Sequence, residues 1–322
     1  MKGNSRQALV ADIGGTHARF AISDIDELTV TNFAVFRCNM FTSLKAAIEA
    51  YMGSVPHRPA MASFAIAGPV TEGELRLTNL PWSFTRDDLR RATGAERLHV
   101  VNDFEALALS LPYLTAHDLH KLGGGEPAEG RPRVVLGPGT GLGVAGLVAA
   151  PSGWVGMPTE GGHVSFPVES GEELEIVEQI RAGEGHLSAE RLISGPGLSR
   201  LYAALAKKRG RHVEPRSVQE IVERGLAKED PLAELALQLF VKWLGRFAGD
   251  VALLYGAGGG VYLGGGIAPR ILDLLATDAF RGAFLSKGRL FSFLERLPVQ
   301  VIKSQDAGLR GAAVALSAAI PV

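Results

Sequence analysis

Residues 8–22 read ALVADIGGTHARFAI, two apolar runs joined by a glycine turn. Ala8 to Ala11 is typical of a buried strand, and Arg19 to Ser23 alternates as a returning strand does. The turn Asp12 to Thr16 therefore predicts a hairpin whose backbone N–H groups are not screened by side chains. Such a turn can surround the oxygens of a phosphate.

Asp12 decides between two interpretations of this turn. A carboxylate repels an anion unless a divalent cation joins it to the phosphates, which favours a metal nucleotide such as Mg-ATP. The alternative is a hairpin in which Asp and Gly only shape the turn. One such turn on its own favours the structural alternative.

A similar unit begins near residue 132. Val134 to Leu136 predicts a strand, GPGTGLG at 137–143 a turn, and Val144 to Ala149 a return strand. Aligning residues 12–22 with 137–147 matches a glycine turn, a threonine and an apolar return strand in each. Two related turns favour phosphate binding over hairpin geometry alone.

The second turn also contains a GxGxxG string at Gly141, Gly143 and Gly146, which is typical of dinucleotide-binding folds. That fold requires a long helix directly after the glycines, and Pro151 and Gly153 would cut such a helix short. We therefore rank the dinucleotide interpretation below the hairpin.

Further elements follow from apolar spacing and capping residues. Ser217 with Glu220 predicts a capping box, and Asp230-Pro231 a helix start. We expect a loop at a domain junction over Leu122 to Arg133 and a closing helix from about Gly308. The other expected helices are Ser43 to Tyr51, Asp87 to Ala92 and Phe104 to Leu111, and the other expected strands are Thr29 to Phe36, Ala62 to Ala67, Leu98 to Val101, Val261 to Leu263 and Val299 to Ile302.

Composition excludes several classes of protein. The 322 residues include 40 glycines, about 12% against a usual ~7%. The net charge of -1 provides no basic field for nucleic acid or an anionic membrane. The lone Cys38, expected as a half-buried strand thiol, can form neither an internal disulfide nor a thiolate zinc cluster. A reducing, cytoplasmic location follows. The uncharged runs 134–159 and 251–269 are too rich in glycine to span a bilayer.

Polar residues gather at the ends of three expected elements. Asn102 and Asp103 follow a strand and precede a helix, where α/β sites form, although they could simply cap that helix. Glu160 and His163 lie three apart around two glycines, and Glu190 lies in a first helical turn, where an acid is also favoured structurally. Glu160, His163 and Glu190 could ligate a metal, but no HExxH motif supports this. The residue types suit a neutral polyol.

Taken together, the motifs resemble the bacterial glucokinase family, the ATP-dependent type within the sugar kinase and actin-like ATPase superfamily. The resemblance covers nearly the whole chain. It rests on ADIGGTHAR (11–19), AIAGPV (65–70), LTNLPW (77–82), VVNDFEALA (100–108), GPGTGLG (137–143), EGGHVSF (160–166), AERLISGPGL (189–198), YLGGGI (262–267) and DAGLRGAA (306–313). One departure is His17, where the family commonly has asparagine.

The resemblance implies an α/β protein with a duplicated actin-like ATPase (ribonuclease H-like) fold, in which two domains with mixed sheets flank a central cleft. A small domain of residues 1–112 and 303–322 would hold the first phosphate loop, and a large domain of residues 113–302 the second phosphate loop, the sugar-contact motifs and the adenosine region. The cleft would close on the sugar and exclude water.

The resemblance also implies the site. Asp103 would be the catalytic base, and Asn102, Asp103, Glu160, His163 and Glu190 the sugar contacts. Asp12 would face Mg²⁺, through water. The implied ATP contacts are Ala11, Asp12, Ile13, Gly14, Gly15, Thr16, Gly139, Thr140, Gly141, Gly265 and Gly266.

The implied reaction is transfer of the γ-phosphoryl group of Mg-ATP to the 6-hydroxyl of glucose, an alcohol-accepting phosphotransfer (EC 2.7.1.2) of glycolysis. Alternatives are a related kinase for mannose, fructose or an N-acetylated hexose, and a non-kinase actin-like ATPase. With eleven residues before Asp12, a preceding DNA-binding domain is not expected. The sequence leaves a homodimer open and predicts no nucleic-acid or membrane partner.

Overall fold

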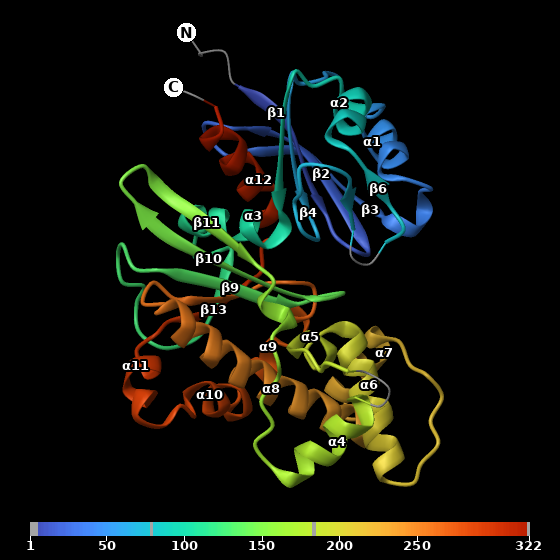
Figure 1. Ribbon diagram of the computed structural model, residues 1–322, viewed down its shortest axis with the longest axis vertical. Coiled ribbons are helices and arrows are strands. Elements are labelled where there is room, and N and C mark those ends of the chain that lie inside the picture. Colours follow the sequence, from blue (N-terminus) through green and yellow to red (C-terminus); the bar gives the residue numbers. More distant parts are fainter. Residues whose placement is uncertain (1–5, 78–79, 182–184, 321–322) are drawn as a thin grey trace. The chain divides into compact units, whose positions relative to one another are not determined.

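The computed structural model describes residues 6–77, 80–181 and 185–320 (Figure 1). Its contacts divide the chain into two compact units. The first comprises Met1–Asp118, Ala150–Pro158 and Ser304–Val322, and the second Leu119–Ala149 and Thr159–Lys303. The domain division expected from the sequence, 1–112 with 303–322 against 113–302, stays a prediction.

The first unit is built on a mixed sheet with the strand order β3-β2-β1-β4-β7. β1 is antiparallel to β2 and parallel to β4, and β4 is parallel to β7. β5 and β6 form a separate two-stranded sheet. The bounds are β1 Gln7–Ile13, β2 His17–Asp24, β3 Val30–Arg37, β4 Met61–Ile66, β5 Leu75–Arg76, β6 Ser83–Phe84 and β7 Arg97–Asn102.

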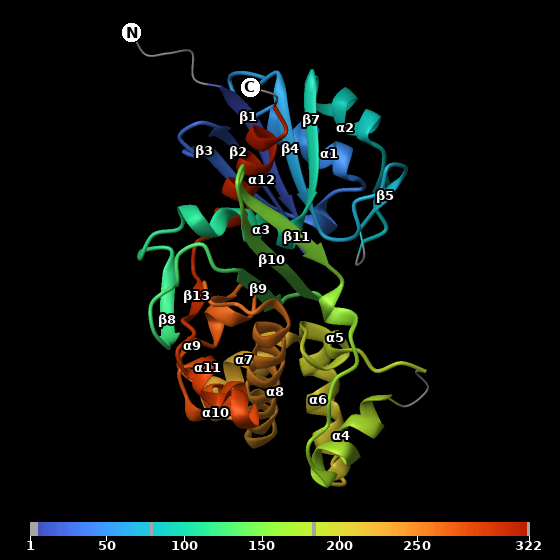
Figure 2. The ribbon, with the colours of Figure 1, turned by 60° about the vertical axis from the view of Figure 1, so that its left-hand side comes forward.

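Two pairs of helices cover the faces of this sheet (Figure 1). Leu9, Ala11 and Ile13 alternate along β1 and share one hydrophobic cluster with buried residues of α1 (Leu44–Met52) and α2 (Arg86–Thr93). The intervening residues of β1 face the other side, where α12 (Ala307–Ala318) lies over the sheet beside α3 (Asp103–Ser110) (Figure 2). Asp12 is therefore on the α12 face.

The second unit repeats the core of this topology. Its strands β10, β9, β12, β13 and β8 are neighbours in that order. β9 is antiparallel to β10 and parallel to β12, and β12 is parallel to β13, as in the order β2-β1-β4-β7. The bounds are β8 Leu119–Gly123, β9 Arg133–Pro138, β10 Leu142–Ala150, β12 Val261–Leu263 and β13 Val299–Ile302, and β11 spans Gly153–Thr159. The expected duplicated α/β fold is confirmed.

Helix α8 (Pro231–Tyr255) is the centre of the second unit's helical layer. Asp230 caps it as expected, its Oδ1 accepting from Leu232 N at 2.9 Å, and Trp243 is fully buried. Within the described ranges no helix is long and apolar enough to cross a membrane. The remaining helices are α4 Gly171–Arg181, α5 Ala189–Leu192, α6 Gly195–Lys208, α7 Val218–Leu226, α9 Leu272–Leu275, α10 Asp278–Leu285 and α11 Phe291–Glu295.

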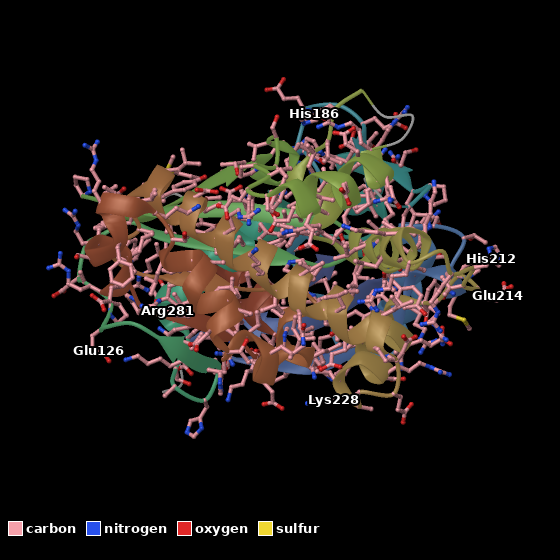
Figure 3. The ribbon with its side chains drawn as sticks, turned by 90° about the horizontal axis from the view of Figure 1, so that it is seen from below. Glu126, His186, His212, Glu214, Lys228 and Arg281 are labelled. Carbon is pink, nitrogen blue, oxygen red and sulfur yellow. The ribbon has the colours of Figure 1, made fainter. Side chains whose placement is uncertain are left out.

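The expected junction loop over Leu122 to Arg133 is only partly a loop. Leu122 and Gly123 end strand β8, and the contact-based units divide earlier, after Asp118. A Cβ at Gly124 would lie 1.8 Å from Leu297 O, so this glycine allows two backbone segments to touch. Arg281 on α10 (Figure 3) closes the same region, donating to Glu295 O at 2.7 Å. Gly124 therefore serves packing.

Cys38 differs from its expected place. It begins the short 3₁₀ helix Cys38–Met40 instead of lying in a strand, and it is 1% exposed instead of half-buried. Its N–H donates to Thr16 O at 2.9 Å and so extends the pairing of β2 with β3 by one residue, while its own carbonyl accepts from Phe41 N at 3.1 Å and begins the helical turn.

Candidate functional site

The first glycine hairpin joins β1 to β2. Ile13 pairs with Ala18, so four residues lie between the last paired positions, and Gly14 N donates to His17 O at 3.0 Å. Ala11, Asp12 and Ile13 end β1, while Gly14, Gly15 and Thr16 form the turn. The predicted first phosphate loop is thus a closed hairpin with its glycines at the tip.

Asp12 is the carboxylate of this hairpin that faces α12. Its Oδ2 lies 3.1 Å from Nη1 of Arg19, which stands directly opposite in the antiparallel register, and its side chain is 19% exposed. Burial raises the pKa of Asp12 above its ordinary value, although Arg19 opposes the shift. Sequence analysis missed Arg19, yet the hairpin register, which pairs position 12 with 19, was the signal that could have found it.

Asn102 and Asp103 stand where β7 ends and α3 begins. The Oδ1 of Asn102 accepts from Phe104 N at 3.0 Å and Glu105 N at 3.1 Å, so Asn102 does cap the helix. Its Nδ2 donates to Gly68 O at 3.1 Å, which ties this turn to the end of β4. Asp103 is the first residue of α3 and is half-buried. Capping thus orients the strand end that presents Asp103.

The second glycine hairpin joins β9 to β10. Pro138 pairs with Leu142, so the three residues Gly139, Thr140 and Gly141 form the connection, and Gly139 N donates to Gly141 O at 2.8 Å. A strand, not a helix, follows the glycines. The dinucleotide interpretation is therefore wrong, because that site needs the N-terminus of a helix at this point.

The late glycine run packs on this hairpin. A Cβ at Gly137 would lie 2.1 Å from Gly264 O, and one at Gly265, whose φ is +77°, would lie 2.5 Å from Pro138 O. Gly264 N also donates to Leu136 O at 2.9 Å. Gly265 and Gly266 therefore lie beside the second turn, as an adenosine region next to a phosphate loop would. Gly137 and Gly265 are therefore required by the close approach of two backbone segments, whether or not a ligand binds here.

Glu160, His163 and Glu190 come together in the second unit. Nε2 of His163 is 3.9 Å from Oε2 of Glu160 and 3.9 Å from Oε1 of Glu190. Ala189 N donates to Val164 O at 2.8 Å, which joins the two segments that carry them. Among the residues the structure describes, no group of three His, Cys, Asp or Glu side chains could hold a metal ion. The metal interpretation of this cluster has no support.

Two contacts of this cluster were not expected from the sequence. Leu142 N, at the end of the second hairpin, donates to Oε2 of Glu190 at 2.8 Å, so the polar cluster is bonded to the glycine turn. His186 (Figure 3) approaches the carbonyl of His163, with its Nε2 at 2.9 Å from the oxygen. No local sequence signal predicts either contact.

Basic side chains also lie near the cluster of Glu160, His163 and Glu190. Burial and the neighbouring Arg191 lower the pKa of Arg200 on α6, while Glu190 acts in the opposite direction. The cluster is thus a mixed polar site. Thr78 and Asn79 of the LTNLPW motif lie outside the described residues.

A family model described as Glucokinase matches residues 9–319. A glucokinase of Cronobacter sakazakii is 41% identical over 308 residues, 96% of each chain. A glucokinase structure from an Antarctic psychrotroph has a TM-score of 0.82 and 35% identity, covering 97% of this chain and 99% of the other. A ROK-family glucokinase of Streptomyces griseus, solved with glucose and AMPPNP, has a TM-score of 0.66 at 20% identity and covers 95% and 98%, a likeness in fold alone.

Proposed function

Because the chain belongs to the glucokinase family, we propose that it transfers the γ-phosphoryl group of ATP to the 6-hydroxyl of D-glucose. The products are glucose 6-phosphate and ADP. The observation that carries the proposal is the repeated glycine hairpin, which occurs in two sheets with the same core strand order. Each hairpin can offer its own set of backbone N–H groups to phosphate oxygens.

In this proposal the hairpin tips hold the phosphates. Gly14, Gly15 and Thr16 serve in the first hairpin, with Ala11 and Ile13 setting the strand behind them. Gly139, Thr140 and Gly141 serve in the second, and Gly265 and Gly266 lie under the adenosine. The packing of Gly265 on Pro138 O supports this assignment, since it places the adenosine region next to a phosphate turn.

The residues present fit Mg²⁺ as a partner of the nucleotide. Asp12 is a partly exposed carboxylate at the start of a glycine turn, and Mg²⁺ is usually bound by one or two carboxylates together with substrate phosphates and water. Asp12 would hold the ion, through water. The ion would neutralise charge on the transferring phosphoryl group.

Glucose would be held by Asn102, Asp103, Glu160, His163 and Glu190. Carboxylates and an imidazole accept and donate to sugar hydroxyls, and the mutual approach of Glu160, His163 and Glu190 supports a shared ligand. Asp103 would accept the proton of the 6-hydroxyl while the oxygen of that hydroxyl forms a bond to the γ-phosphorus. The bond from that phosphorus to the β,γ-bridging oxygen then breaks, and ADP leaves.

We also propose a cytoplasmic location, which the single buried cysteine supports. The sugar specificity is tested by coupled ADP release with glucose, mannose, fructose and N-acetylglucosamine at equal concentrations. Glucose should give the highest kcat/KM. A higher value with another hexose would replace glucose as the substrate, and ATP turnover that no hexose changes would remove the kinase assignment.

The role of Asp103 is tested by Asp103→Asn. Loss of a carboxylate base typically costs about 10² to 10⁴ in rate, so kcat should fall by that factor while glucose still binds in titration calorimetry. The matched control is Glu105→Gln, which replaces another carboxylate in the same helical turn. Burial raises the pKa of Glu105, so the ionised form of this side chain is costly in the folded state and its loss should not destabilise the helix. Near wild-type kcat in Asp103→Asn would remove Asp103 from the mechanism.

A further inference from the structure

The first turns of α12 bring two glycines against the elements that carry the proposed reactive carboxylates. A Cβ at Gly308 would lie 3.1 Å from Oδ2 of Asp12. A Cβ at Gly311 would lie only 1.7 Å from the backbone oxygen of Ala106 in α3. Residues three apart share one face of a helix, so a single glycine face of α12 contacts both neighbours.

The contact at Gly311 bears on Asp103 through the geometry of α3. Ala106 lies three residues after Asp103, so the two are neighbours along one side of that helix. The contact at Ala106 is backbone against backbone, and no side-chain rotation relieves it. The separation of α12 and α3 therefore sets how far Asp103 stands from the α12 face of the sheet.

The sheet beneath α12 is equally close-packed. β1 and β4 present Ala8, Val10, Ser63 and Ala65 beside Asp12, and all four are 0% exposed. α12 itself buries Ala307, Ala312 and Ala313. Small side chains on both surfaces leave α12 no space to sink further toward the sheet.

Ion pairs hold the start of α12 in place. Nε of Arg310 donates to Oδ2 of Asp306 at 3.0 Å, and Nη1 of Arg310 to Oδ2 of Asp118 at 3.3 Å. The Arg310 side chain is 24% exposed and that of Asp118 13%. A side chain added to the glycine face would therefore displace Asp12 or α3 before it displaces α12.

We propose that Gly308 and Gly311 are positioning residues of the phosphoryl transfer: the glycine face of the C-terminal helix holds the Asp12 carboxylate and the Asp103 helix at their working separation. This inference rests on the proposed function, which assigns Asp12 to the metal nucleotide and Asp103 to the sugar hydroxyl. It gives the DAGLRGAA motif a role at the reacting groups without any contact with substrate.

The test uses Gly308→Ala and Gly311→Ala in the full chain, with Gly282→Ala as the matched control. Gly282 is also inside a helix, α10, but a Cβ there would meet no atom within 4 Å other than its chain neighbours and the helix's own backbone. Melting temperature, kcat and both KM values are measured for each variant. Glycine to alanine favours a helix by about 1 kcal/mol, so Gly282→Ala should melt higher with unchanged kinetics.

We expect Gly311→Ala to lower kcat by about 10²-fold, since a displacement of about 1 Å at the reacting groups costs that much. The milder contact at Gly308 should raise the KM for Mg-ATP about tenfold and leave the KM for glucose unchanged, since a shift of a few tenths of an ångström costs less. Loss of folded protein would lower kcat alone and would not separate the two KM values.

Double-variant cycles separate positioning from a structural effect. If Gly311 acts through Asp103, then Gly311→Ala should cost almost nothing further in an Asp103→Asn background, and Gly308→Ala nothing further in Asp12→Asn. Additive losses in both cycles would overturn the inference. If Gly311→Ala does not fold, the Gly308→Ala cycle decides alone. A wild-type chain that fails to phosphorylate any hexose would refute the proposed function instead, whatever the variants do.

Discussion

The two glycine hairpins have related sequences but different chemistry. The first presents the Asp12 carboxylate, paired with Arg19 across the strands. In the alignment of the two turns Asp12 corresponds to Gly137, where a Cβ would lie 2.1 Å from Gly264 O and no side chain fits. The first hairpin therefore contributes a charge, while the second contributes backbone that fits tightly against its neighbour.

The two hairpins also differ in the number of residues between their last paired positions. Four residues separate the pair Ile13 and Ala18, but three separate Pro138 and Leu142. Relative to the sequence alignment, the return strand of the second hairpin is shifted by one residue, so Leu142 and not Gly143 takes the place of Ala18. That shift places Leu142 N–H where it donates to Glu190, and the second hairpin thus gains its carboxylate from another element, α5.

Among the changes that test this comparison of the two hairpins, the largest effect is expected for Asp12→Asn. In the proposed function this carboxylate faces the metal nucleotide, so its loss should remove several kcal/mol of charge stabilisation and lower kcat/KM for glucose phosphorylation by about 10² to 10³. Stability should not fall with it, because burial makes the ionised Asp12 costly in the folded state. In Asp12→Asn, activity would then fall without a loss of stability.

The pH dependence of stability tests whether ionised Asp12 is costly in the folded state. A carboxyl whose folded pKa is raised stabilises the folded state below its unfolded pKa and loses that contribution as pH rises through the folded value. In metal-free and nucleotide-free buffer, Asp12→Asn should therefore equal the wild type in acid and exceed it at pH 7. The control is Asp26→Asn, because Arg6 lowers the pKa of Asp26 and the sign is reversed. A less stable Asp12→Asn at pH 7 would show that Arg19 outweighs burial.

The second prediction concerns Gly137→Ala. The added Cβ would meet backbone atoms of Gly264, so no side-chain rotation can relieve the overlap. We expect the free energy of unfolding to fall by about 3 kcal/mol. Gly139→Ala is the matched control within the same hairpin, since its nearest atom would be 4.0 Å away. Denaturant melts should place the control within about 0.5 kcal/mol of the wild type. Equal losses of unfolding free energy in Gly137→Ala and Gly139→Ala would contradict the idea that the second hairpin depends on close packing at Gly137.

The sequence predicted both hairpins because apolar runs bounded by glycine are local signals. The strands Val261–Leu263 and Val299–Ile302 have the expected bounds for the same reason. The approach of Gly137 to Gly264, by contrast, joins residues far apart along the chain, and periodicity carries no information about such contacts. The site shows the same contrast between local and long-range contacts. Glu160, His163 and Glu190 do come together, but the bond from Leu142 N to Glu190 depends on the one-residue shift in register.

The smallest effect is expected for Cys38, which contacts the first hairpin through its backbone and its thiol. Its N–H donates to Thr16 O at 2.9 Å and its Sγ lies 3.6 Å from Gly14 O, while burial raises the pKa of the thiol to about 11. At pH 8 the native thiol should therefore react with iodoacetamide at least about 10²-fold more slowly than the same thiol in urea.

Cys38→Ala keeps the backbone donor to Thr16 and removes only the thiol. We expect it to cost about 1 kcal/mol of stability and to leave kcat within twofold of the wild type, measured by the same coupled assay. A loss of turnover approaching that of Asp12→Asn would mean that the thiol holds the turn in its working conformation. The first hairpin would then depend on close packing as the second does, and the charge of Asp12 alone would no longer account for the difference between them.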